Sequence, residues 1–130
     1  MPDEPLSARR KVVLVVLFVP SVQRDGKTGI DQDRWVREAM EVFATHFGGA
    51  TAYPKAKGIW RDDEREGVLV WDEPVVVHCY TEPKFVEDEG KMQQVMSLCR
   101  KMGLETLQGE VGLVVQDEYF PIRDFNEGTI

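Results

Sequence analysis

The chain has 130 residues and a mass of 14.8 kDa, with 42% hydrophobic and 30% charged residues, which are values of one folded domain and exclude disorder throughout. The net charge of −7 is uneven: residues 1–65 carry 11 Lys/Arg against 10 Asp/Glu, and residues 66–130 carry 5 against 13. A nucleic-acid-binding domain needs a basic surface, so this charge argues against a nucleic-acid partner.

The N-terminal region combines a polar arm with one apolar run. Residues 1–10 are polar and contain two prolines, and we predict a mobile arm there. Val12–Val19 is apolar at both sets of alternating positions, which predicts a central strand buried on both faces. This run is far shorter than the ~20 residues of a membrane span. Asp3 and Glu4 stand where a secretion signal should be positive, so we predict a cytoplasmic protein with no membrane partner.

A helix and an irregular strand follow. Asp25-Gly26 predicts a turn, and Asp31 is a helix-capping residue before an amphipathic stretch that runs to Phe47. Gly48 then supplies the left-handed stop. The next segment, 50–60, reads as one strand at a sheet edge, because its proline cannot donate a ladder hydrogen bond.

The second half of the sequence predicts further strands and a second helix. Val68–Trp71 and Val75–Thr81 predict two strands, or one strand bent at Pro74. A second helix is expected over Phe85–Met102, closed by the glycine that follows it. The last strand is predicted at Val111–Val115, and residues 117–130 are expected to be a tail.

This order of elements is that of the ferredoxin-like split βαβ fold. We therefore predict one α+β domain over residues 11–116, a sandwich in which two helices cover one face of an antiparallel sheet. The doubly apolar first strand requires that the open face also be covered. Either the C-terminal tail, through Tyr119 and Phe120, or a second copy of the chain can do this, and we predict a homodimer.

The middle of the chain, over roughly residues 12–115, resembles an uncharacterised family of small bacterial domains of unknown function. The shared features are a turn after the first strand, a tryptophan that opens the first helix, and a G-x-T run leading to G-x-W-R. In this sequence they are Asp25-Gly26, Trp35, Gly49-Ala50-Thr51 and Gly58-Ile59-Trp60-Arg61. The resemblance implies the same fold and carries no activity.

Neither a metal nor a cofactor is predicted. Cys79 and Cys99 are the only cysteines and form no C-x-x-C pair, so we expect two buried free thiols, with one disulfide as the alternative. The run Asp62–Glu73 has the offsets of a calcium loop, but glutamates replace its short ligands and a predicted strand follows. An acidic hairpin turn is the simpler interpretation.

The chemically most capable residues are His78, Tyr80 and Glu82, which alternate along one strand and so share one face. An imidazole, a phenol and a carboxylate can transfer protons at neutral pH, although a polar outer strand face gives the same pattern. Arg61 is the candidate anion clamp, and Trp60 beside it is the second candidate ligand-binding residue.

Two functions are compatible with these observations. The absence of a catalytic motif favours a small acidic binding or assembly domain without catalysis, which self-associates through the open sheet face or binds another protein. The alternative is a small-molecule-binding protein or enzyme whose pocket lies on the sheet face and uses His78 and Tyr80. A concave pocket around these two residues would favour the alternative.

Overall fold

A computed structural model describes residues 10–126, so the arm predicted for residues 1–10 lies outside the described residues except for its last position. Along this range the chain forms β1 (Val13–Val19), α2 (Gln32–Phe47), β2 (Thr51–Tyr53), β3 (Gly58–Asp62), a 3-10 turn η1 (Asp63–Arg65), β4 (Val68–Asp72), β5 (Val75–Thr81), α3 (Pro83–Val86), α4 (Glu89–Glu105), β6 (Val111–Val115) and β7 (Glu118–Ile122).

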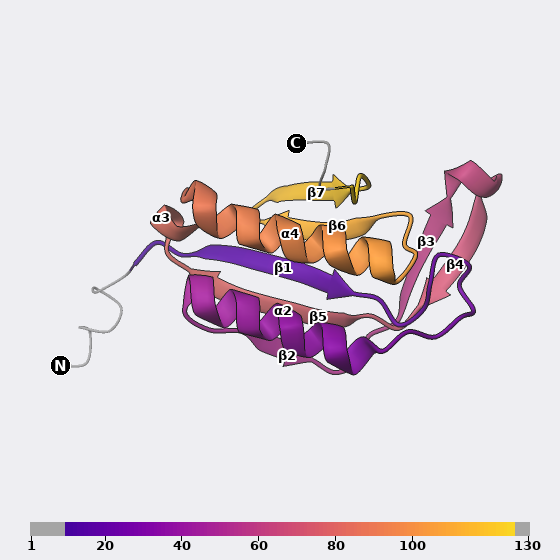
Figure 1. The fold of residues 1–130 in the computed structure, drawn as a ribbon, viewed down its shortest axis with the longest axis horizontal. Helices are drawn as coiled ribbons and strands as arrows, with labels where there is room; N and C mark the ends of the chain where they lie inside the picture. The colour runs from indigo at the N-terminus through magenta and orange to yellow at the C-terminus, as the bar shows by residue number, and fades with distance from the viewer. Residues whose placement is uncertain (1–9, 127–130) are drawn as a thin grey trace.

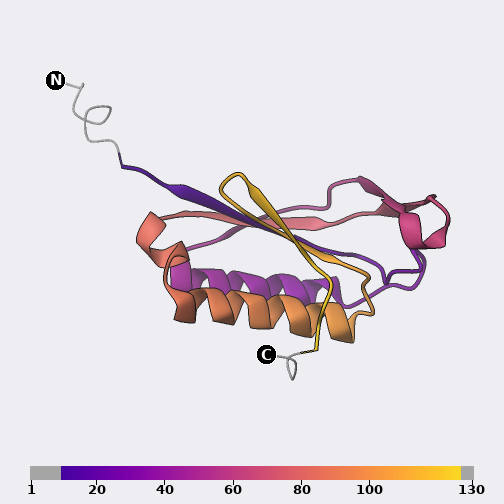
Figure 2. The same ribbon diagram turned by 90° about the horizontal axis from the view of Figure 1, so that it is seen from above.

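Five of the strands form one antiparallel sheet in the order β2-β5-β1-β6-β7. Figure 2 shows α2 and α4 lying side by side against one face of this sheet. The first four strands of that order give the ferredoxin-like arrangement, so the predicted α+β class is confirmed, with β1 central. The extra strand β7 extends one edge, and β3 and β4 form a separate hairpin at one end of the molecule (Figure 1).

Helix α2 forms where the sequence signals place it. The Asp31 side chain accepts a hydrogen bond from the Arg34 amide at 3.2 Å, and Gly48 ends the helix with a φ of 98°. The apolar side chains on the inward side of α2 pack against the inner faces of β1, β5 and β6 in a single core. The largest fully buried side chains of this core include Trp35 and Phe43. In the described part of the chain, no helix is long and apolar enough to cross a bilayer.

The middle of the chain differs from the prediction. The single irregular strand expected over residues 50–60 is two strands in two sheets, because the chain leaves the main sheet at Pro54, which lacks an amide hydrogen. Pro74 likewise separates β4 from β5, which settles the alternative between two strands and one bent strand. Because of these two prolines, β3 and β4 do not pair with the main sheet and form a separate hairpin.

The C-terminal region also differs. Residues 118–122, expected within a tail, form β7 beside β6, so Tyr119 and Phe120 belong to the sheet and do not fold over it. Helix α4 continues past its predicted end to Glu105, and Gly103 lies buried inside it. A β-carbon on this glycine would overlap the ring of Phe125, so close contact explains the glycine better than helix termination does.

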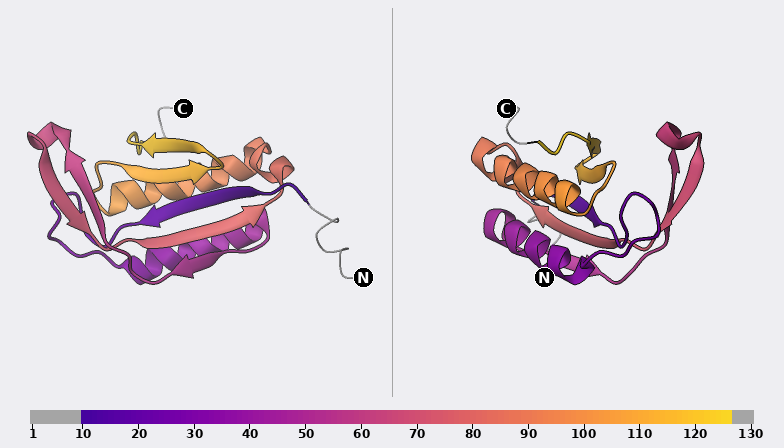
Figure 3. Two further views of the ribbon diagram at one scale, coloured as in Figure 1. Left: turned by 180° about the vertical axis from the view of Figure 1, so that it is seen from behind. Right: turned by 45° about the vertical axis from the view of Figure 1, so that its right-hand side comes forward.

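The face of the main sheet away from the helices is open, as the view from behind in Figure 3 shows. Strand β1 is therefore central, but residues 10–126 of one chain do not cover it on both sides. Leu14 and Val16 are partly exposed there and Phe18 is 38% exposed, while the alternate residues are buried. Cys79 and Cys99 are both buried and free, as predicted.

Candidate functional site

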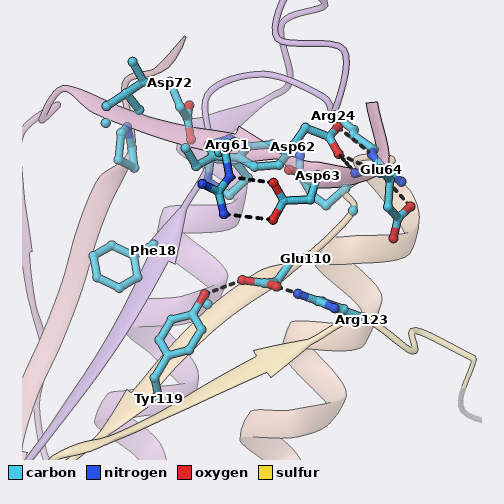
Figure 4. A pocket seen from close by; sticks show the side chains of 18 residues that line it. Phe18, Arg24, Arg61, Asp62, Asp63, Glu64, Asp72, Glu110, Tyr119 and Arg123 are labelled. Atoms are coloured by element: carbon cyan, nitrogen blue, oxygen red, sulfur yellow. Dashed lines mark hydrogen bonds and ion pairs between the residues drawn. The ribbon is translucent and has the colours of Figure 1, made fainter. Parts of the chain in front are cut away.

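A concave feature lies between the β3–β4 hairpin and the nearby end of the open sheet face (Figure 4). It is a cleft of about 630 Å³. The hairpin, the sheet and three connecting segments all contribute to its lining: Phe18, Pro20, Arg24, residues 58–64, Asp72, Pro74, residues 108–110, Gly112, Tyr119 and Arg123.

Hydrogen bonds connect the base of the β3–β4 hairpin to the end of β1 and the residues that follow it. Ser21 donates to Asp72 from both its amide, at 2.9 Å, and its hydroxyl, at 2.6 Å, and its hydroxyl oxygen accepts from the Glu73 amide. The Gln32 side chain, at the start of α2, donates to the carbonyls of Val19 and Glu73. These bonds set the angle at which the hairpin leaves the sheet, and so they shape one wall of the cleft.

The far end of the hairpin is held by a buried carboxylate. The side chain of Asp62 is only 3% exposed and accepts hydrogen bonds from Arg24 at 3.2 and 3.3 Å and from Arg65 at 2.7 Å. The Arg24 guanidinium, followed by that of Arg65, lowers the pKa of Asp62 from 3.8 to about 2. Arg24 also bonds Glu64 at 2.8 Å, so one arginine from the loop after β1 holds both the residue that caps η1 and the middle residue of η1.

A second polar cluster forms the opposite wall. The Tyr119 hydroxyl donates to Glu110 at 2.5 Å, and Arg123 donates to the other oxygen of Glu110 at 2.8 Å. Burial, and then the hydrogen bond to Glu110, raises the pKa of Tyr119. A β-carbon at Gly112 would lie 2.8 Å from the Tyr119 hydroxyl, so this glycine leaves the space that the phenol occupies.

Of the five predicted site residues, two line the cleft. Trp60 lies on β3 with 38% of its surface exposed, and Arg61 follows it. The Arg61 guanidinium bonds the Asp63 carboxylate, which raises the pKa of Arg61. Arg61 would therefore have to exchange this partner in order to bind a ligand anion.

The other three predicted residues lie elsewhere. His78 and Tyr80 share the open sheet face, opposite Val16 and Leu14, and Glu82 follows β5 as an exposed residue. The His78 ring stacks on Tyr53 at 4.9 Å and meets Tyr80 edge-on at 5.9 Å. None of the three is among the residues that line the cleft, which lies at the end of the sheet near the hairpin.

The cleft offers both apolar surface and charge. Phe18, Ile59, Trp60 and Tyr119 supply aromatic or aliphatic area, and the lining carries five carboxylates against three guanidiniums. Such a site suits a small ligand with a flat ring, hydroxyl groups and net positive charge. Within residues 10–126, no group of three or more His, Cys, Asp or Glu side chains is placed to hold a metal ion.

Sequence reasoning missed the residues that make the cleft polar. Arg24, Glu110 and Arg123 come from three segments separated by up to a hundred positions, and no motif connects them. Tyr119 was noticed only as a possible cover for the sheet. The one usable signal was Gly112 inside an apolar strand, because a glycine there often marks the close approach of another group.

Comparison with known proteins gives a structural likeness. No family model and no curated protein sequence match this chain. Among solved structures, the chain is similar to a phage SAM lyase in complex with S-methyl-5'-thioadenosine, with a TM-score of 0.65 and 14% identity over 89% of this chain and 95% of that one. It is also similar to a phage SAM lyase in the apo state, with a TM-score of 0.60 and 16% identity over 85% and 88%.

These neighbours share the fold and correct one prediction. Both are enzymes, which contradicts the expected binding or assembly domain without catalysis. They favour instead the alternative, a small-molecule-binding protein or enzyme. The sequence shows no motif for the cleft because its lining residues are scattered between positions 18 and 123.

Proposed function

We propose that this chain is a lyase that binds S-adenosylmethionine in the cleft beside the β3–β4 hairpin and releases S-methyl-5'-thioadenosine. The observation that carries the proposal is the cleft itself, in a chain that follows the fold of a phage SAM lyase over nearly its whole length. Its volume of about 630 Å³ falls within the range typical of small-molecule sites.

The lining offers a partner for each part of this substrate. Phe18, whose ring points into the cleft in Figure 4, can present the flat apolar surface that an adenine ring requires. Glu110 is a carboxylate able to accept hydrogen bonds from both ribose hydroxyls, and it is already oriented by Tyr119 and Arg123. The excess of carboxylates in the lining favours a ligand with a positively charged sulfonium.

The chemistry requires little of the protein beyond positioning. Release of S-methyl-5'-thioadenosine breaks the bond between the sulfonium sulfur and the γ-carbon of the methionine portion, and the electron pair remains on sulfur. Without added water, an oxygen of the substrate's own carboxylate can form the new bond to the γ-carbon and give a five-membered lactone. This route needs no protein base, in keeping with a cleft where Asp62, Asp63 and Glu110 already accept hydrogen bonds from arginines.

The positive charge on sulfur and the negative charge on the attacking oxygen both disappear as this reaction proceeds. An apolar surrounding therefore favours the transition state over the solvated, charge-separated substrate. Within a lining that also carries charge, Phe18 and Ile59 are the apolar residues proposed to contact the reacting atoms. The proposed role of the protein is thus to hold the substrate bent, with the carboxylate near the γ-carbon, and to exclude water from it.

The test incubates the purified chain with S-adenosylmethionine and measures S-methyl-5'-thioadenosine by chromatography and mass spectrometry, against a protein-free control for spontaneous decay. We expect release well above that control. Glu110→Gln should reduce it by about tenfold or more, because hydrogen bonds to a charged group are worth ~1.5–3 kcal/mol. Glu105→Gln is the matched control, since Glu105 is an ion-paired glutamate outside the cleft.

Two results would contradict the proposal. One is release equal to the protein-free control together with no heat of binding for S-methyl-5'-thioadenosine in calorimetry. The other is equal activity in folded Glu110→Gln and wild-type protein. The cytoplasmic location predicted from the sequence also remains a proposal, supported by two buried free thiols that fit a reducing compartment.

A further inference from the structure

The open face of the five-stranded sheet has an unusual composition. Its residues come from all five strands, and none of those that alternate onto it is charged, although 30% of the chain is. They are Leu14, Val16, Phe18, Thr51, Tyr53, Val76, His78, Tyr80, Gly112, Val114, Tyr119 and Pro121. An antiparallel sheet that faces water on one side normally carries polar residues there.

This face leaves both apolar surface and a polar group without partners. Tyr53, Tyr80 and Tyr119 are each more than half exposed. At its centre, both ring nitrogens of His78 are buried and, among the described residues, have no hydrogen-bond partner. An uncharged surface with three exposed tyrosines is typical of an interaction site, because tyrosine is enriched in interfaces.

We propose that a second copy of this chain covers the open sheet face. The C-terminal segment does not do so as far as Asn126, the last described residue, because β7 is part of the sheet and Phe125 packs against Gly103 on the helix side. Charge points to another copy: two chains that each carry −7 repel least where they meet through a face without charges. An isologous contact then places identical uncharged surfaces against each other.

The size of the face is adequate for such a contact. With strands ~4.8 Å apart and a rise of ~3.3 Å per residue, the five strands of the sheet present a flat area of roughly 450 Å². Because tyrosine and phenylalanine side chains project from this plane, the accessible area is larger and approaches the ~800 Å² that one partner buries in a standard interface. The inference rests on the fold alone and does not depend on the proposed lyase activity.

The experiment measures the mass of the intact chain in solution, without ligand, by light scattering and sedimentation up to the hundred-micromolar range. We expect at least two copies, in multiples of 14.8 kDa. Leu14→Lys should reduce the mass to that of one chain, whereas Leu104→Lys should leave it unchanged. Leu104 is the matched control because it is 61% exposed on α4, away from the sheet face.

Circular dichroism establishes that each variant is folded. If Leu14→Lys unfolds, Tyr80→Lys takes its place, because Tyr80 is 64% exposed and its loss removes little packing within one chain. A wild-type mass of one chain throughout the concentration range would overturn the inference, and so would a folded face variant that keeps the wild-type mass. Phe18, Gly112 and Tyr119 belong both to this face and to the cleft lining, whereas Leu14 and Tyr80 lie outside the cleft, so these two variants test association without altering the cleft.

Discussion

Gly103 offers a test of how the C-terminal segment is held against the helices. It lies buried within α4, and a β-carbon added there would lie 2.5 Å from Cδ1 and Cζ of Phe125, and closer still to Cε1. Gly103→Ala should therefore force the Phe125 ring out of its place. The same substitution also improves the helix, so two opposing effects of similar size decide the outcome.

The magnitudes can be worked out separately. Replacing glycine by alanine inside a helix stabilises it by about 1 kcal/mol. Phe125 is partly buried against the core, and its burial is worth about 1–2 kcal/mol. Gly103→Ala alone should therefore destabilise the protein by up to about 1 kcal/mol, whereas in a Phe125→Ala background it should stabilise by about 1 kcal/mol.

The assay is urea unfolding of the wild type, the two single variants and the double variant, with the slope m compared across all four. The expected signature is a change of sign between the two backgrounds and a coupling of about 1–2 kcal/mol. If Gly103→Ala stabilises both backgrounds equally, Phe125 does not occupy this place and the reasoning is refuted.

Three further predictions concern the anchor of the hairpin, the core and the thiols. Because the pKa of Asp62 is lowered to about 2, the stabilising hydrogen bonds of its carboxylate are fully formed above pH ~4 and are lost as pH falls toward 2. Asp62→Asn should therefore make the melting temperature fall less steeply with decreasing pH in that range. An equally steep profile in the variant would contradict this role. Val15→Asp places an unpaired charge at a fully buried position and should cost several kcal/mol in urea unfolding, whereas a small loss would show that the strand is not central. Burial raises the pKa of Cys79 to about 11 and that of Cys99 to about 12, so both should resist alkylation at pH 8 until the protein unfolds. Rapid labelling of the native chain, followed by mass spectrometry, would contradict their burial.

Much of the candidate site was beyond sequence reasoning, for reasons visible in particular residues. Arg61 was predicted as an anion clamp and Trp60 as a ligand-binding neighbour, and both line the cleft. His78 and Tyr80 were singled out by alternation, which places them correctly on one sheet face but says nothing of where that face is hollow. The cleft follows from where the β3–β4 hairpin leaves the sheet, and the bonds of Ser21 and Gln32 set that geometry.

The sequence by itself determined the fold class and most of the local elements. The strand over 13–19, the capped helix ending at Gly48 and the order of elements depend on hydrophobic periodicity and on capping chemistry, which act between near neighbours along the chain. Tertiary structure decided the rest. Three contacts illustrate this: β7 pairs with β6, Phe125 packs against Gly103, and Arg24 bonds Asp62. In each case the sequence around one residue does not indicate which residue will be its partner. Such contacts form only once the chain has collapsed around its core, because their free energy comes from burial and geometry that no short segment possesses.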